Sequence, residues 1–371
     1  MVRASDIAET WFRLFLYIQE SSKYNTAVGI NYDGAKIMAL PRPKIGLIFS
    51  GGSILMSRSG KVISVTAAKD MRGWVSEVPE LKVIADLEPI FVFGGKTETI
   101  SPSIWQKLAK EVRRHYRKVD GFVVTHSPDT IGYTGAALSF MLQNLGKPVV
   151  LTGAKEGVVK KRIINRVFRP FRTYGIRANL VNAVQVATMD IAEVAVMTGS
   201  RLVRATQLVS SQQSEQDGVG MGVLGQINFG ISLELEHQRR RKTALVFRPD
   251  IDERVFVIQM HPGMNTPSLL SSVPTDAHAL LIRGVEAAAS KDDMKAVLSL
   301  ADERQIPVFL ESDESTRLKN DKRIISLPLM EAETSLVKTM WAMGQSSSIA
   351  ELREMMDENF AHENLEEEIG K

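Results

Sequence analysis

The sequence predicts an α/β protein with two domains, a larger amino-terminal one built on a doubly wound parallel sheet and a smaller α/β domain after it. Two observations lead to this prediction. Short continuous apolar runs recur along the chain and alternate with helical stretches, as in parallel strands that are buried on both faces and joined by helices. The length of 371 residues is that of about two domains.

The strand and helix alternation begins at Lys44 and defines the larger domain, residues 41–238. The apolar runs that we interpret as its strands are Ile45–Phe49, Pro89–Phe93, Gly121–Thr125, Val149–Thr152 and Val194–Met197. Helices are expected between them at Ser103–Tyr116 and Thr134–Leu145, because parallel strands need crossover connections. The glycine-rich stretch 218–230 has no regular periodicity.

The rest of the chain divides into an appendage, a linker, a second domain and a tail. Residues 1–40 form the N-terminal appendage, and a linker is expected at 239–242. The smaller domain, 243–345, has its own alternation of apolar runs and helical stretches, at Val255–Gln259, Ala279–Ile282, Asp293–Glu303 and Pro307–Leu310. Residues 346–371 hold a helix, Ser348–Phe360, which serines can cap, and an acidic tail.

Composition excludes several classes of site. The chain has no cysteine, so disulfides, thiolate metal sites and cysteine nucleophiles are excluded. Its six histidines show no metal-ligand spacing, and we expect neither a metal nor a cofactor. With 46 basic and 43 acidic residues, total charge gives no argument for nucleic acid. No leader or membrane span is evident, so a cytoplasmic protein without membrane association is expected.

Two polar loops follow predicted strands, where α/β proteins bind their ligands. The first is Ser50–Ile54, in which two glycines let the backbone approach a ligand and two serines flank them. The second, His126–Thr130, lies between a strand and a helix. Asp129 or Thr130 is suited to cap that helix, and a carboxylate held there can also bind a substrate ammonium group. His126 is interpreted as structural.

The two loops resemble those of the asparaginase/glutaminase family. The family reads Thr-Gly-Gly-Thr-Ile at the first loop, where this chain has SGGSI. At the second loop it reads Gly-x-Val-x-x-His-Gly-Thr-Asp-Thr-Met, where this chain has GFVVTHSPDTI. Further matches follow in the family's order, at 132–154, 179–184, 224–227 and 261–264. The resemblance spans residues 44–360 and implies the two-domain asparaginase-type fold, in a homo-oligomer with sites at subunit boundaries.

Two shorter segments resemble one branch of this family, the D subunit of the archaeal-type glutamyl-tRNA(Gln) amidotransferase. They are YNTAVGINYDGAKI, residues 24–37, and SIAELREMMDENFAHE, residues 348–363. Both signals are weaker than those of the two loops.

The resemblance implies hydrolysis of a side-chain amide through an acyl-enzyme. By motif, Ser53 takes the position of the nucleophile, and a serine hydroxyl can replace the usual threonine. Asp129 takes the position that holds the substrate's α-amino group. Thr97 falls near the hydroxyl that contacts the substrate carboxylate, and Ser127 lies beside Asp129 in the same substrate-binding loop.

Two departures from the family pattern affect the proton-transfer groups. Pro128 replaces the catalytic threonine of the second loop and has neither a hydroxyl nor an N–H. An alignment of the NLVNAV segment without gaps puts Asp190 where the family has its catalytic lysine, and an anion there disfavours a developing oxyanion. Lys155 is a candidate substitute for that lysine. A hydroxyl nucleophile needs a neighbouring base, so weakened activity is expected.

Two functions follow from these residues. The first is an amidohydrolase that acts on asparagine or glutamine with weakened activity. The alternative is a catalytically inactive relative that serves as a binding, regulatory or tRNA-amidotransferase-like subunit. Pro128 and Asp190 favour the alternative, whereas the intact Asp129 favours retained binding of a small amide amino acid.

Two segments of the chain, residues 155–177 and 351–371, have strongly unbalanced charge. Residues 155–177 carry eight Lys or Arg and one Glu, with Phe168, Phe171 and Tyr174 interleaved. This segment is either a solvated basic loop or a surface for RNA or another polyanion. Residues 351–371 carry eight acids and two bases, and either pair with the basic segment in an oligomer or solubilise the chain.

Overall fold

The computed structural model describes two α/β domains. The residues that it describes are 41–51, 54–56, 62–94, 100–153, 176–208, 222–227, 231–233, 237–240, 244–284, 291–311 and 324–369. The N-terminal appendage expected at residues 1–40 lies outside them.

The larger domain contains an eight-stranded sheet in the order β11-β10-β9-β8-β7-β5-β1-β4. Its strands are β1 (Lys44–Ser50), β4 (Asp86–Phe93), β5 (Gly121–Thr125), β7 (Val149–Thr152), β8 (Val194–Thr198), β9 (Arg201–Arg204), β10 (Val223–Ile227) and β11 (Ile231–Leu233). The first five strands are parallel to one another. Each of the last three pairs antiparallel with the strand before it in the chain. All five apolar runs predicted as strands are confirmed.

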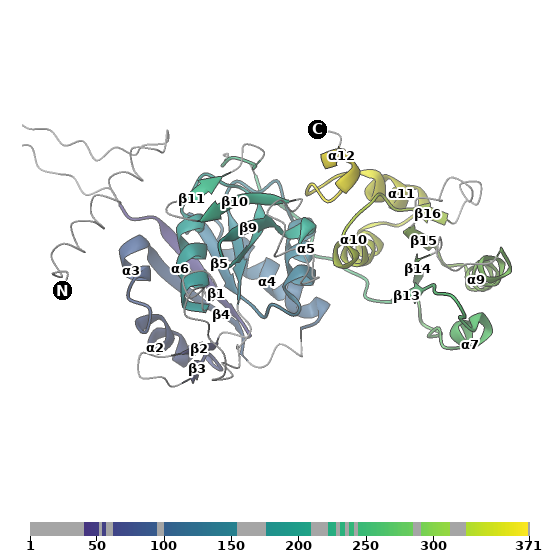
Figure 1. Cartoon of the computed structure of the whole chain (residues 1–371), viewed down its shortest axis with the longest axis horizontal. Helices are drawn as coiled ribbons and strands as arrows, with labels where there is room; N and C mark the ends of the chain where they lie inside the picture. Colours follow the sequence, from purple (N-terminus) through teal and green to yellow (C-terminus); the bar gives the residue numbers. More distant parts are fainter. Residues whose placement is uncertain are drawn as a thin grey trace, which may run out of the picture.

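Helices cover both faces of this sheet (Figure 1). One face packs against α4 (Pro102–His115) and α5 (Ile131–Met141), and the other against α2 (Met71–Ser76), α3 (Leu81–Ile84) and α6 (Ile176–Ala187). Successive side chains of β1 alternate between the two cores, with Leu47 in one and Ile48 in the other. This two-sided burial explains why the strands read as continuous apolar runs.

Two elements of the larger domain differ from the sequence prediction. Helix α5 ends at Met141 rather than Leu145, because Leu142–Gln143 form β6 and pair with β12 (Val246–Phe247). The chain then turns at Asn144, whose φ is 56°. The glycine-rich stretch 218–230 contains strand β10, which was not expected. A short hairpin of β2 (Ile54–Met56) and β3 (Val62–Ser64) follows the first polar loop.

The smaller domain contains a four-stranded parallel sheet in the order β13-β14-β15-β16. Its elements are β13 (Val255–Gln259), α7 (Thr266–Ser271), β14 (Ala279–Arg283), α9 (Lys291–Arg304), β15 (Val308–Glu311), β16 (Ile324–Ser326), α10 (Ala332–Gln345), α11 (Ile349–Asp357) and α12 (Leu365–Ile369). Helices α7 and α9 cover one face, and α10 and α11 contribute to the core on the other. The Ser348 hydroxyl accepts the Glu351 amide, which confirms a serine cap on α11.

The two domains share one hydrophobic core. Helix α10 packs along α5, and Trp341 of α10 stacks on Phe140 of α5 with ring centroids 5.5 Å apart. Arg240, expected in the linker, is held by the larger domain. Its guanidinium donates to the carbonyls of Asp120, Met189 and Ala187, at 2.5, 2.5 and 2.7 Å.

Residues 358–364, which we call the C-terminal strap, return from the smaller domain to the larger one. The Lys338 ammonium, 1% exposed, donates to the Glu363 carboxylate at 2.7 Å and to the carbonyl of Glu358 at 2.7 Å. On the far side, the Thr206 hydroxyl and the Gln207 amide donate to strap carbonyls. Glu363 belongs to the acidic stretch 351–371, for which the sequence left open pairing with the basic segment or solubilising the chain; this carboxylate does neither within the described residues, because it is fully buried and pairs with Lys338.

None of the described helices combines the length and the apolar character needed to cross a bilayer.

Candidate active site at the carboxyl edge of the large sheet

The carboxyl ends of β1 and β5 lie side by side and are tied together. The Ser50 hydroxyl, at the end of β1, donates to the carbonyl of Thr125 at 2.8 Å. The next residue, Gly51, has a φ of 67° and donates its amide to the carbonyl of Phe93 at the end of β4. A positive φ is readily adopted by glycine, so Gly51 suits this turn. Ser53, which the first loop carries, lies outside the described residues.

The second polar loop is pressed against the end of β7. The His126 amide donates to the carbonyl of Thr152 at 2.9 Å, which extends the strand pairing by one residue. A Cβ on Gly153 would lie 1.9 Å from the carbonyl oxygen of His126. Only a residue without a side chain permits this approach, so Gly153 sets the position of the loop.

His126 is buried in a network that accounts for both ring nitrogens. Nδ1 lies 2.9 Å from the carbonyl of Ser127 and must donate to it, so Nε2 accepts from the Thr134 hydroxyl at 2.8 Å. The Trp105 indole donates to the same hydroxyl at 3.1 Å. Burial lowers the pKa of His126 to about 4, so the ring is neutral at neutral pH. This geometry supports the interpretation of His126 as structural.

The candidate substrate-binding residues follow β5 directly. Ser127 is buried, and its hydroxyl accepts the Asp129 amide at 3.4 Å. Pro128 is half-buried, whereas Asp129 is exposed. The structure therefore presents the carboxylate of Asp129 at the carboxyl edge, with Ser127 supporting the loop beneath it. Thr97 lies outside the described residues.

Near this edge, two buried side-chain atoms of described residues, one on Thr130 and one on Asn179, have no hydrogen-bond partner. The Thr130 hydroxyl makes no bond, although Thr130 starts α5, so its expected role as a side-chain cap is wrong. The Oδ1 atom of Asn179 is also unpaired, while its Nδ2 donates to the carbonyl of Gly153 at 3.0 Å. Unpaired buried polar atoms are costly and are often explained by a ligand, ion or water. Of the two residues, the sequence analysis did not single out Asn179, although it begins the 179–184 match that supports the resemblance.

Asp190 lies at the opposite edge of the sheet from Asp129. It precedes β8, whose first residue, Val194, pairs with Val149 at the amino end of β7. Its carboxylate accepts the Arg240 amide at 2.8 Å. The expectation that Asp190 takes the position of a catalytic lysine is therefore wrong, because the length of the parallel strands separates Asp190 from the candidate site.

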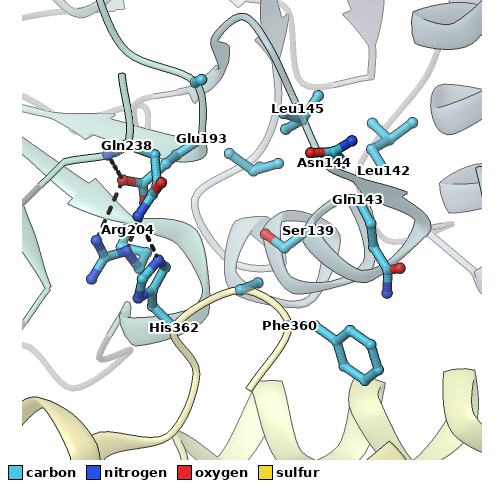
Figure 2. Close-up of a pocket in the computed structure, with 13 residues that line it drawn as sticks. Ser139, Leu142, Gln143, Asn144, Leu145, Glu193, Arg204, Gln238, Phe360 and His362 are labelled. Atoms are coloured by element: carbon cyan, nitrogen blue, oxygen red, sulfur yellow. Dashed lines mark hydrogen bonds and ion pairs between the residues drawn. The ribbon is translucent and has the colours of Figure 1, made fainter. Parts of the chain in front are cut away.

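A cavity of about 190 Å³ also lies away from the candidate site. Its polar wall contains Glu193 and Arg204, a buried ion pair with a separation of 2.7 Å. The backbone N–H of Gln238 donates to the Glu193 carboxylate at 2.6 Å, and the side-chain Nε2 of Gln238 lies 3.0 Å from the Nε2 atom of His362 (Figure 2). The cavity is a space between the strap and the amino edge of the sheet, because Glu193 immediately precedes β8.

Other groups singled out from the sequence have a smaller described part. Lys155 and most of the basic segment 155–177 lie outside the described residues, and Arg177 forms an ion pair with Glu80 at 2.6 Å. Within the described part of the chain, no three His, Asp or Glu side chains are grouped so that they could hold a metal ion.

Comparison with known proteins identifies the family. The family model described as Asparaginase, N-terminal matches residues 44–240, which is more than half of the chain. The chain belongs to the asparaginase family.

Similar proteins within the asparaginase family include components of an amidotransferase. Proteins named as the D subunit of glutamyl-tRNA(Gln) amidotransferase, from Pyrococcus abyssi, Pyrococcus horikoshii and Thermococcus kodakarensis, are 30%, 29% and 28% identical to this chain. The alignments cover 86%, 86% and 87% of this chain and 76%, 76% and 78% of those proteins. The resemblance found from the two loops is confirmed, including its weaker signals for the D subunit.

Solved asparaginases have the same fold. The L-asparaginase I of Vibrio cholerae has a TM-score of 0.69 and 25% identity, over 87% of this chain and 99% of that one. The L-asparaginase of Thermococcus kodakarensis has a TM-score of 0.67 and 22% identity, over 86% and 98%. The fold class predicted from the sequence is confirmed.

Proposed function

We propose that this asparaginase-family chain hydrolyses the side-chain amide of asparagine or glutamine, with a slow rate. One observation carries the proposal: the exposed carboxylate of Asp129 follows β5, whose end is bonded to the end of β1. Strand β1 leads within three residues to Ser53, the hydroxyl in the nucleophile position of the motif. Two loops at one carboxyl edge are the arrangement in which α/β folds bind small ligands.

The slow rate is argued from Pro128. A proline between Ser127 and Asp129 supplies neither a hydroxyl nor an N–H at the position of the family's second catalytic threonine. General acid–base groups contribute about 10²–10⁴-fold to a rate, and a serine without a base is a poor nucleophile. Asp190 no longer adds to this argument, because it lies at the other edge.

The test is ammonia release from asparagine and from glutamine at saturating concentration. Replacing Pro128→Thr should raise the rate at least about tenfold, since it restores the hydroxyl. Ser53→Ala is the blank, and Asp190→Asn is the matched control, which should leave the rate unchanged. Fast turnover in the unmodified protein that is lost in Ser53→Ala would show that the site is intact and refute the slow-rate proposal.

A second candidate function is a subunit that binds the amide amino acid without releasing ammonia alone. The names of the relatives favour it, because a protein named as the D subunit of glutamyl-tRNA(Gln) amidotransferase matches 86% of this chain. Partner proteins and tRNA would then be required for activity. This function is favoured if aspartate raises the melting temperature of the protein, Asp129→Ala abolishes that shift, and neither the wild type nor Pro128→Thr releases ammonia. The homo-oligomer stays a prediction, which a measurement of mass in solution tests.

A further inference from the structure

The solvent face of α4 and the turn after it is densely basic. Residues 107–118 contain six Lys or Arg, one in two, whereas the chain as a whole has 46 in 371. We call residues 107–118 the α4 ridge. All six of its basic side chains are exposed: Lys107, Lys110, Arg113, Arg114, Arg117 and Lys118. The opposite face of α4 is apolar and buried, and it contributes Ile104, Trp105, Leu108, Ala109 and Val112 to the core.

The helix dipole explains only part of this ridge. Cations near the C-terminus of a helix are stabilising, but the effect is limited to the last turn. Arg113 and Arg114 lie in the last turn of α4. Lys107 and Lys110 lie before it, and Lys118 follows the helix. Fold stability alone therefore does not account for the run.

The carboxylates near the ridge already have cationic or backbone partners. Glu111 lies 3.4 Å from both Arg114 and His115. Glu88 pairs with Lys44 and with His115, and Asp120 accepts the Lys44 amide at 2.7 Å. Glu88 also interacts electrostatically with Lys118, which helps to lower the pKa of its carboxyl group, but none of these acids forms an ion pair with Lys107, Lys110 or Arg117. In the part of the chain that the structure describes, no ion pair involves Lys107, Lys110, Arg117 or Lys118.

The spacing of the ridge matches a phosphate backbone. At about 1.5 Å per helical residue, the ridge is about 17 Å long and carries one positive charge per about 3 Å. A nucleic-acid duplex carries one negative charge per about 1.7 Å of its axis. The two densities are of the same order, so several ridge cations can face phosphates along one stretch of a duplex.

The aromatic side chains near the ridge that the structure describes are unavailable for stacking on bases. Trp105 is buried, and the ring of Tyr116 stacks on Phe122 with centroids 6.5 Å apart. Lys147 covers the same Tyr116 ring at 4.6 Å, and Arg113 covers Phe247 at 4.5 Å. Binding of single strands usually relies on exposed aromatic platforms, whereas duplex backbones are bound by charge. The geometry therefore favours a double helix over a single strand.

We propose that the α4 ridge binds the phosphate backbone of double-helical nucleic acid without reading its sequence. The ridge runs toward the amino edge of the large sheet, where the turn after α4 meets Lys44 and Arg240. Asp129 lies at the other edge. The ridge is thus a separate surface, and its test does not depend on amide hydrolysis.

The test is fluorescence anisotropy of the full chain with labelled RNA and DNA hairpins and a single strand, between about 50 and 200 mM salt. The tested variant carries glutamine in place of four ridge cations, chosen because they form no ion pair: Lys107, Lys110, Arg117 and Lys118. Hairpin binding should weaken at least about tenfold at low salt. The slope of log affinity against log salt should fall in magnitude by about 3–4, since each phosphate contact contributes about 0.9. Comparison of the two hairpins shows whether the backbone bound is RNA, DNA or either.

The matched control replaces four exposed cations outside the ridge with glutamine, which gives the same net charge: Lys69, Arg72, Lys82 and Lys295. It should bind the hairpins as the wild type does, and ammonia release should be equal in the wild type and both variants. The proposal is overturned if no hairpin binds at low salt, if both variants weaken equally, or if the single strand binds more tightly. Equal competition by polyglutamate would also overturn it, in favour of an acidic protein partner.

Discussion

Lys338 and Glu363 form a fully buried ion pair, and replacing one of them should destabilise the protein strongly. Lys338→Met leaves the carboxylate of Glu363 in the core without its cation, and it removes the donor to the carbonyls of Met356 and Glu358. Breaking a buried pair from one side costs about 3–5 kcal/mol, because the remaining charge is buried and uncompensated. We expect the free energy of unfolding to fall by about that amount in Lys338→Met.

Removing both charges should cost less than the two single changes together. In Glu363→Gln the ammonium of Lys338 keeps its carbonyl partners, but the amides of Phe360 and Ala361 lose a charged acceptor. The double variant, Lys338→Met with Glu363→Gln, leaves no buried charge. Residues in direct contact typically show a coupling energy of about 0.5–3 kcal/mol, and we expect the upper part of this range.

The assay is urea unfolding followed by tryptophan fluorescence. Trp341 lies edge-on to Phe360 of the C-terminal strap with centroids 5.1 Å apart, so its emission reports the release of the strap. The matched control is Lys295→Gln, which removes an exposed pair with Asp292 and should change stability by less than about 0.5 kcal/mol. A cost below about 1 kcal/mol for Lys338→Met, or strict additivity in the double variant, would refute the reasoning.

Two further predictions concern the loop at the candidate site. Burial lowers the pKa of His126 to about 4 in the folded protein. Between about pH 6.5 and pH 4 the imidazole is therefore protonated in the unfolded state but neutral in the folded state. Stability should therefore fall by up to about 3 kcal/mol as the pH drops through that window. Unfolding curves at several pH values check this, and a loss of the same size in His126→Gln would contradict it. Gly153→Ala should destabilise by about 1–3 kcal/mol, since its Cβ would meet the His126 carbonyl. The control is Gly73→Ala, where the added Cβ meets nothing within 4 Å; it should be neutral or slightly stabilising. Thermal melts of the two glycine variants and the wild type check this.

The parallel strands could be predicted from sequence because each is buried on both faces. β5 and β7 have the predicted bounds, and their residues are all buried. Helix α10 could not be recognised in the same way. Its buried face includes the charged side chain of Lys338, which interrupts the apolar stripe that marks a core-facing helix. The reason for a lysine there is the strap, which comes from residues later in the chain.

The candidate site was predictable where a motif directly follows a strand. The loop that carries Ser127 and Asp129 begins directly after the last residue of β5, so its place at the carboxyl edge follows from the strand alone. Asp190 was misplaced because the ungapped alignment runs through α6. That helix has 12 residues and carries the chain about 18 Å back along the strands, from the carboxyl edge to the amino edge of the sheet.

The strap makes the larger domain depend on residues that are synthesised after both sheets. The ribosome adds about 5–20 residues per second, so roughly 6–25 s separate the emergence of Arg240 from that of Leu365. During this interval the nascent larger domain can form its sheet while Thr206 and Gln207 lack their strap partners. Newly made chains therefore pass through a period in which this edge is open to chaperones and to other nascent chains. Ribosome stalling beyond codon 240 would lengthen that period without altering a single contact of the finished protein.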